Sequence, residues 1–184
     1  MGTARAAFAC LCLACLCLAG CAVAEYPYPT AWDPLVPQAD SDCREFAGRF
    51  ADRGERDDDP SKPSLTRELF GEFSDWENAR TVQLAMPKEG VLEISVANDA
   101  AGQLFARTLR KDKDFSCRGG RLIVRDRRWI AGYIMSGRQH VEVELNQAGP
   151  QLVAQVEEMA YGMMFVIFPV VGTARHWYRF ERLR

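Results

Sequence analysis

Residues 81–96 read TVQLAMPKEGVLEISV, and this stretch decides the fold class. Apolar and polar side chains alternate on both sides of Pro87-Lys88-Glu89-Gly90, and a period of two is typical of strands with one buried face. The segment between them, which contains a proline and a glycine, is typical of a hairpin turn. We therefore expect antiparallel strands at 81–86 and 91–96.

The same period continues along most of the chain. Further strands are expected at 46–50, 103–109, 121–126, 132–135, 140–145, 152–157, 163–170 and 176–183, with turns at 119–120, 136–137 and 147–150. One short helix is expected over 65–70, because Ser64 can cap its start and Gly71 can end it. The sequence therefore predicts a mainly β fold, an antiparallel meander that forms a single barrel-like or sandwich domain with one short helix.

The composition separates the N-terminus from the rest. The 184 residues carry a net charge of -2, which gives no reason to expect nucleic acid as a partner. Of the first 21 residues, 17 are hydrophobic, and Arg5 is the only charged side chain before Glu25. A positive start, an apolar run and small residues at its end predict a secretory signal peptide over 1–20.

The end of that run, Leu18-Ala19-Gly20-Cys21, resembles the lipobox of bacterial lipoproteins. The resemblance implies cleavage before Cys21 and acylation of that cysteine, and several acyl chains anchor a protein stably. In such lipoproteins the residue after the cysteine influences sorting, and Ala22 implies the periplasmic face of the outer membrane. The expected partner is thus the membrane, reached through Cys21.

Two other interpretations of the N-terminus remain open. Ala22-Val23-Ala24 could act as an ordinary cleavage site and release a soluble periplasmic protein. The uncharged stretch 6–24 has 19 residues, nominally enough to span a bilayer without cleavage.

The mature chain divides into a tether and a domain. Residues 21–42 contain Pro27, Pro29, Pro34 and Pro37, which indicate a semi-extended tether, whereas 43–184 form the single β domain. Cys43 and Cys117 are the two cysteines left after Cys21, so a disulfide is expected in an oxidising compartment. Two buried free thiols are the alternative.

Catalytic signals are weak. The usual motifs of hydrolases, nucleotide-binding proteins and zinc proteases are missing, so we expect no enzyme, no catalytic residues, no cofactor and no metal site. His140, Glu142 and Glu144 alternate along one strand and could hold a metal, but a solvated sheet face is favoured. The acidic run 57–59 likewise favours a solvated loop over a calcium site.

Two further features could bind a partner. Arg125, Arg127, Arg128 and Trp129 suit phosphate or sugar surfaces, although a solvated strand edge is favoured. Residues 160–172 read AYGMMFVIFPVVG, an uncharged run without alternation whose second face needs a cover. One interpretation is that the short helix or a loop supplies that cover. The other is that the run forms a cavity or an apolar surface for an acyl chain or a partner.

These features predict a lipid-anchored structural or interaction module of the cell envelope, with an envelope protein as a partner. The alternative is carriage of a hydrophobic small molecule such as a lipid by a β-barrel, whose ligand-binding residues the sequence leaves unknown.

Overall fold

The fold is taken from a computed structural model, which describes residues 21–36, 43–56, 61–72, 75–100, 102–131, 135–165 and 168–184. Its helical elements are the 3-10 turns η1 (Arg44–Phe46) and η2 (Trp76–Asn78) and the helix α2 (Leu65–Phe70). Its strands are β1 (Cys21–Glu25), β2 (Gly48–Ala51), β3 (Thr81–Lys88), β4 (Val91–Ala97), β5 (Gln103–Arg110), β6 (Phe115–Arg118), β7 (Arg121–Ala131), β8 (Met135–Ala148), β9 (Gln151–Met164), β10 (Phe168–Phe180) and β11 (Arg182–Leu183).

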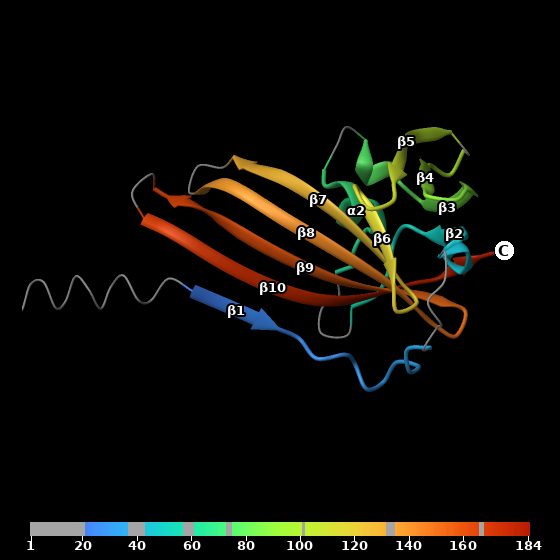
Figure 1. Cartoon of the computed structure of the whole chain (residues 1–184), viewed down its shortest axis with the longest axis horizontal. Coiled ribbons are helices and arrows are strands. Elements are labelled where there is room, and N and C mark those ends of the chain that lie inside the picture. The colour runs from blue at the N-terminus through green and yellow to red at the C-terminus, as the bar shows by residue number, and fades with distance from the viewer. Residues whose placement is uncertain are drawn as a thin grey trace, which may run out of the picture.

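The strands form two sheets. The first has the order β1-β10-β9-β8-β7-β6 and is called the long sheet here; the second has the order β11-β2-β3-β4-β5. The long sheet extends well beyond the second one, which covers only one end of it (Figure 1). The prediction of a mainly β meander with one short helix is confirmed. The two sheets do not close into a barrel, so the architecture is sandwich-like.

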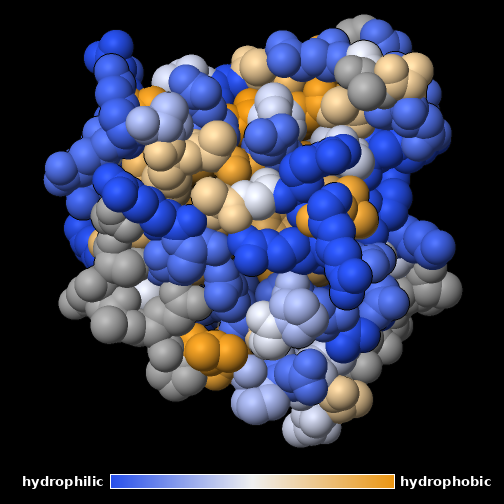
Figure 2. All heavy atoms as spheres, turned by 90° about the vertical axis from the view of Figure 1, so that its right-hand side faces the viewer, coloured by the Kyte–Doolittle hydropathy of each residue, from blue (hydrophilic) through white to orange (hydrophobic). Residues whose placement is uncertain are grey.

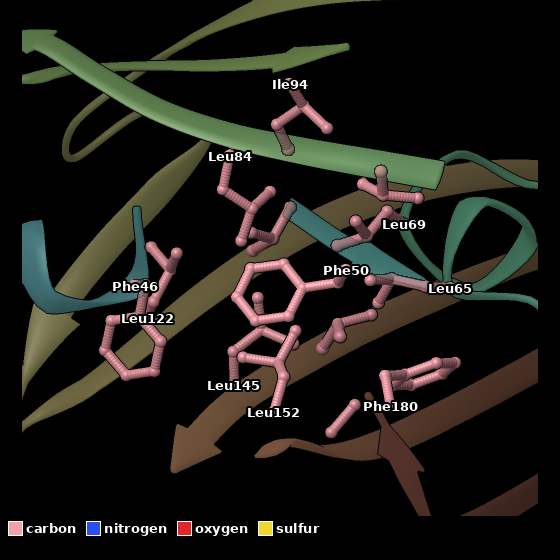
Figure 3. Close-up of a cluster of buried hydrophobic side chains, with 14 of the residues drawn as sticks. Phe46, Phe50, Leu65, Leu69, Leu84, Ile94, Leu122, Leu145, Leu152 and Phe180 are labelled. Atoms are coloured by element: carbon pink, nitrogen blue, oxygen red, sulfur yellow. The ribbon is translucent and has the colours of Figure 1, made fainter. Parts of the chain in front are cut away.

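The core lies where the two sheets overlap. Alternate residues of β7, β8, β9 and β10 point from the long sheet toward β2, β3 and β4, as the alternation of buried positions requires. Figure 3 shows this cluster, in which Phe50, Leu84 and Ile94 of the second sheet lie opposite Leu145 and Leu152 of the long sheet. The buried end of the molecule is therefore the end with the second sheet.

Helix α2 closes one side of that core with Leu65 and Leu69. Its start follows the sequence prediction, because the Ser64 side chain accepts a hydrogen bond from the Arg67 amide at 3.2 Å and Gly71 follows the helix with φ 76°. Asp52, fully buried, accepts from the Ser64 hydroxyl at 3.0 Å and from the Thr66 amide at 2.9 Å.

The strands of the long sheet are longer than predicted, and two of the predicted divisions between them are wrong. Residues 132–135 and 140–145 were expected as separate strands with a turn at 136–137, yet 135–148 form the one strand β8. Gly137 is needed there for another reason: a Cβ on it would lie 2.2 Å from the Tyr161 carbonyl oxygen of β9. The expected strand 163–170 is divided between the end of β9 and the start of β10, and Phe165 between them has φ 51°.

The segment after Cys21, expected as a semi-extended tether, packs on the long sheet. β1 pairs with β10 in parallel, with Cys21 opposite Val171 and Glu25 opposite Arg175. Trp32 is buried against Ala148 and Val153 on the outer face of the sheet. The prolines exclude regular structure from 26–36, but they do not prevent the burial of Trp32 between them. Pro37 lies outside the described residues, as do 38–42.

The predicted disulfide is present between Cys43 and Cys117. It joins the start of the β domain to β6, across 74 positions in the chain. The signal peptide at 1–20 and the acidic run at 57–59 lie outside the described residues. Within the described ranges, no helix has both the length and the hydrophobicity needed to cross a bilayer.

Candidate functional site

The outer face of the long sheet, which points away from the second sheet, changes character along its strands. In antiparallel pairs, directly opposite residues share a face, so the pairing register defines rows of neighbouring side chains. Near the core the outer face is covered by the segment 26–36, whose Trp32 and Tyr28 lie against Val153 and Trp177. Nothing else in the described residues covers the other end of that face.

We call that uncovered end the distal face. Its exposed apolar side chains come from β1, β7, β9 and β10, and two arginines lie between them: Val23, Trp129, Met159, Tyr161, Met163, Val171, Arg127 and Arg138. One row of the register runs Trp129, Arg138, Tyr161, Val171 and then Cys21. Trp129 is 66% exposed and Val23 is 68% exposed. Such a cluster of large apolar side chains on one surface is typical of an interaction site.

A ladder of ion pairs separates the distal face from the covered part of the sheet. Arg125 Nε lies 2.8 Å from Glu142 Oε2, and Arg175 Nη2 lies 2.7 Å from Glu157 Oε2. Arg175 also reaches Glu25 of β1 at 3.3 Å. In this row each arginine has a carboxylate beside it, so little net positive charge remains there.

The arginines of the distal face differ from those of the ladder. Arg127 and Arg138 have no carboxylate partner among the described residues. Together with Trp129, His140 and Tyr161 they line a shallow hollow of about 340 Å³. His140 Nε2 lies 3.2 Å from the Tyr161 hydroxyl, which fixes the aromatic side of the hollow. The hollow can therefore accept an anionic group between aromatic rings.

The tip of the β9–β10 hairpin adds two more apolar side chains at this end of the molecule. Phe165 is 59% exposed and Phe168 is 56% exposed. At the opposite end of the molecule, which Figure 2 shows, the surface is mostly hydrophilic and its hydrophobic areas are small and separate. The distal end is thus the apolar end of an elongated molecule.

A second candidate site is the cleft between α2 and the inner face of the long sheet. It has a volume of about 700 Å³ and charged and aromatic walls, which include Arg67, Glu68, Arg128, Gln139, Glu158, His176 and Tyr178. Arg128 closes one side of it by donating from Nη2 to the Glu68 carbonyl oxygen at 2.5 Å. The cleft is open and polar, so it suits a charged or hydroxylated molecule better than an acyl chain.

Glu68 is the unusual group of this cleft. Burial raises its pKa to about 7, and the charge of Glu158 acts in the same direction, whereas Arg67, Arg128 and Arg56 lower it. Burial, and then the charge of Glu68, also raise the pKa of Tyr178 above its usual range. Glu68 can therefore exchange a proton near neutral pH.

The predicted cluster of His140, Glu142 and Glu144 lies on the outer face of β8, with Val141 and Val143 buried on the other side. Its members are engaged separately, since Glu142 pairs with Arg125 and Glu144 pairs with Arg121 at 2.9 Å. No group of side chains within the described part of the chain is arranged to hold a metal ion.

The arginine cluster of β7 is divided between two faces. Arg125 belongs to the ion-pair ladder, and Arg128 points inward, where its Nε contacts Asp126 Oδ2 at 3.0 Å. Only Arg127 and Trp129 of the four remain together on the distal face.

The apolar run 160–172 contributes to the distal end from both of its strands. Met163 and Val171 are exposed on the distal face, and Phe165 and Phe168 are exposed at the tip. Residues 166–167 lie outside the described residues. Helix α2 packs on β7 and β8 near the core and so does not cover the exposed side chains of this run.

Among the site residues that the sequence analysis did not identify, Arg138 and Glu68 are the most important. Arg138 carries no local signal, because only the pairing of β8 with β7 and β9 brings it beside Trp129 and Tyr161. The sequence does carry a signal for Glu68, because this residue lies three positions after Leu65 and thus on the buried face of a short helix.

In comparisons with known proteins, no family model, no curated protein and no solved structure matches this chain. The function is therefore argued from the geometry of these two sites.

Proposed function

We propose that the protein is a lipid-anchored module of the outer membrane, held at its periplasmic face through acylated Cys21, and that it serves the envelope as a structural or interaction protein. The acyl chains supply the anchor, and the sandwich supplies a surface for a partner at the membrane. Anchoring also raises the local concentration of that surface for any partner in the same membrane.

One observation carries this proposal. β1 pairs with β10 in a register that sets Cys21 opposite Val171, at the end of the sheet with the exposed apolar side chains. An anchor at the charged end would turn the apolar end toward water, whereas an anchor at Cys21 brings it to the membrane. The lipobox and the exposed apolar surface are independent features of the chain, and both favour the same end of the sheet as the one at the membrane.

The alternative, a carrier of a hydrophobic molecule, has less support. It required a closed barrel, and the two sheets are open. The cleft beside α2, about 700 Å³ in volume, has charged walls, which favour polar ligands over acyl chains. We assign no reaction to the protein.

Replacement of Cys21 tests the anchor. In cells that express the full chain, Cys21→Ser should move the protein from the membrane fraction to the soluble fraction, and the mass of the wild-type N-terminal peptide should include the acyl chains. Cys17→Ser is the matched control, because it removes a cysteine of the same apolar run and should leave the fractionation unchanged. If Cys21→Ser still sediments with membranes after a salt wash, the anchor is not at Cys21.

A further inference from the structure

We propose that the distal face is a binding surface for anionic bilayer lipids, with the headgroup phosphate between Arg127 and Arg138. The inference rests on the proposed membrane anchor and adds to it. An acyl anchor alone would leave the domain free to turn, whereas a binding face fixes the long sheet against the bilayer and defines which surface stays available to partners.

The chemistry of the distal face matches the interfacial region of a bilayer. Trp129 and Tyr161 each combine an apolar ring with a polar atom, and these two residue types are enriched where headgroups meet acyl chains. Met159, Met163 and Val171 supply apolar surface around them. Arginine can keep its charged end at the headgroups while its aliphatic part lies on apolar neighbours.

The charge pattern of the outer face favours anionic lipid over neutral lipid. Arg127 and Arg138 lie on the same face of neighbouring strands, one row apart in the register, and neither is neutralised by a described carboxylate. In the adjoining ladder, Arg125 and Arg175 are neutralised. The unneutralised positive charge thus lies next to the exposed apolar side chains, as binding to an anionic interface requires.

The extent and place of the face also fit a bilayer. From β1 to β7 it crosses five strands, or about 19 Å at the usual strand spacing. The backbone of Cys21 pairs with Val171 at one edge of it, so the acylated residue belongs to this end of the sheet. Phe165 and Phe168 extend the apolar surface at the hairpin tip.

A second copy of the chain is a poorer occupant of this face. A symmetric dimer would bury the same patch of both copies and bring four arginines, two copies each of Arg127 and Arg138, into one interface without described carboxylates to pair with them. Anionic headgroups supply the missing charge.

The test uses acylated protein, produced from the full chain, in vesicles whose lipids carry bromine on the acyl chains, because bromine quenches tryptophan fluorescence on contact. The vesicles contain either phosphatidylcholine alone or an equal mixture with phosphatidylglycerol. We expect part of the tryptophan fluorescence to be quenched in the mixed vesicles. Trp129→Phe should abolish this quenched component, although the variant keeps Trp32, Trp76 and Trp177. Absence of a quenched component from Trp129 would overturn the proposal.

The arginines are tested with a matched pair of double variants. Arg127→Gln with Arg138→Gln should lower the ratio of docked to undocked protein about 25-fold in the mixed vesicles, since each arginine at an anionic surface contributes about a factor of five. Arg121→Gln with Arg125→Gln removes the same charge from ion pairs of the same face and should change the ratio much less. Equal effects of the two variants, or equal docking in both lipids, would overturn the assignment to anionic headgroups.

Flotation of the vesicles separates this proposal from the anchor. If the wild-type chain and Cys21→Ser float to the same extent with vesicles of phosphatidylcholine alone, for which the distal face has no anionic headgroup to bind, the anchor fails. The quenching of Trp129 fluorescence in the mixed vesicles still decides the binding face. If the wild-type protein floats but the fluorescence of Trp129 is not quenched, the anchor is supported and the binding face is refuted. A doubled native mass together with lost quenching would assign the face to a second copy instead. Thermal unfolding of each variant verifies that it is folded.

Discussion

Burial changes the proton affinity of Glu68, and this makes stability depend on pH. The native state binds this proton more tightly than the unfolded chain does, because its pKa is raised from 4.5 to about 7. The stabilisation from the protonated form is fully present below about pH 4.5 and is lost as pH rises through about 7.

Glu68→Gln should therefore gain stability relative to wild type as pH rises over that interval, by up to about 3 kcal/mol above pH 7. Urea unfolding of both proteins across this range measures the difference. Glu72→Gln, at an exposed carboxylate two residues after the helix, should give a curve parallel to that of wild type. If the Glu68→Gln curve is also parallel, Glu68 is charged in the native protein.

A second residue-scale effect belongs to Gly137, where β8 and β9 approach too closely for a side chain. Gly137→Ala would set a Cβ 2.2 Å from the Tyr161 carbonyl oxygen, so the strands must separate at this point. We expect a loss of about 1–3 kcal/mol in unfolding free energy, with faster amide exchange in β8 and β9 near the distal end. Gly119→Ala, in the β6–β7 turn, meets no atom within 4 Å but has φ 57°, so it strains that turn without separating β8 from β9. It should not produce the local increase in exchange at the distal end. If exchange is unchanged in Gly137→Ala, β8 and β9 are not in close contact at this point, and residues 136–137 form the turn that the sequence predicts.

At the scale of elements, α2 depends on two side chains outside it. Ser64 caps the Arg67 amide, and Asp52 holds both Ser64 and the Thr66 amide from the preceding strand region. Since six residues are too few for a stable isolated helix, these bonds and the packing of Leu65 and Leu69 keep it in place.

Ser64→Ala should lower the unfolding free energy by about 1 kcal/mol, and Asp52→Ala by about 2 kcal/mol because the buried Thr66 amide loses its acceptor. Chemical denaturation measures both losses. Ser64→Thr keeps a hydroxyl at the cap and should recover most of the first one. A Ser64→Ala protein as stable as wild type would show that packing alone holds the helix.

For the whole molecule, the segment 26–36 is part of the folded unit. Trp32 is 8% exposed, and Arg179 lies over its ring at 5.0 Å. Tyr28 lies edge-on to Trp177 and hydrogen-bonds the Asp33 carbonyl oxygen at 2.6 Å. This packing, together with β1, joins the proposed anchor to the sheet without a flexible spacer.

Trp32→Ala should therefore lower the unfolding free energy by about 3 kcal/mol, as expected for the loss of a buried aromatic side chain. Val36→Ala changes the same segment at a side chain that is 48% exposed and should have little effect. Thermal and urea unfolding measure both. If Trp32→Ala unfolds like wild type, the segment is a tether that does not contribute to the stability of the fold.

The sequence by itself determined the β class, the capped helix and the disulfide. These follow from local patterns: alternation in 81–96, Ser64 and Gly71 around a short apolar segment, and one pair of cysteines, Cys43 and Cys117, after Cys21. Each is decided by neighbours in the chain or by a simple count, so the sequence carries the information directly.

Only the tertiary structure decided the open sandwich, the single strand β8, the burial of Trp32, and the distal face. Each depends on which distant segments meet. Trp129, Arg138 and Tyr161 become neighbours through the register of three strands, and Cys21 joins their row through a parallel pairing across about 150 positions. Registers are set by burial summed over whole strands, so no local pattern in the sequence specifies them.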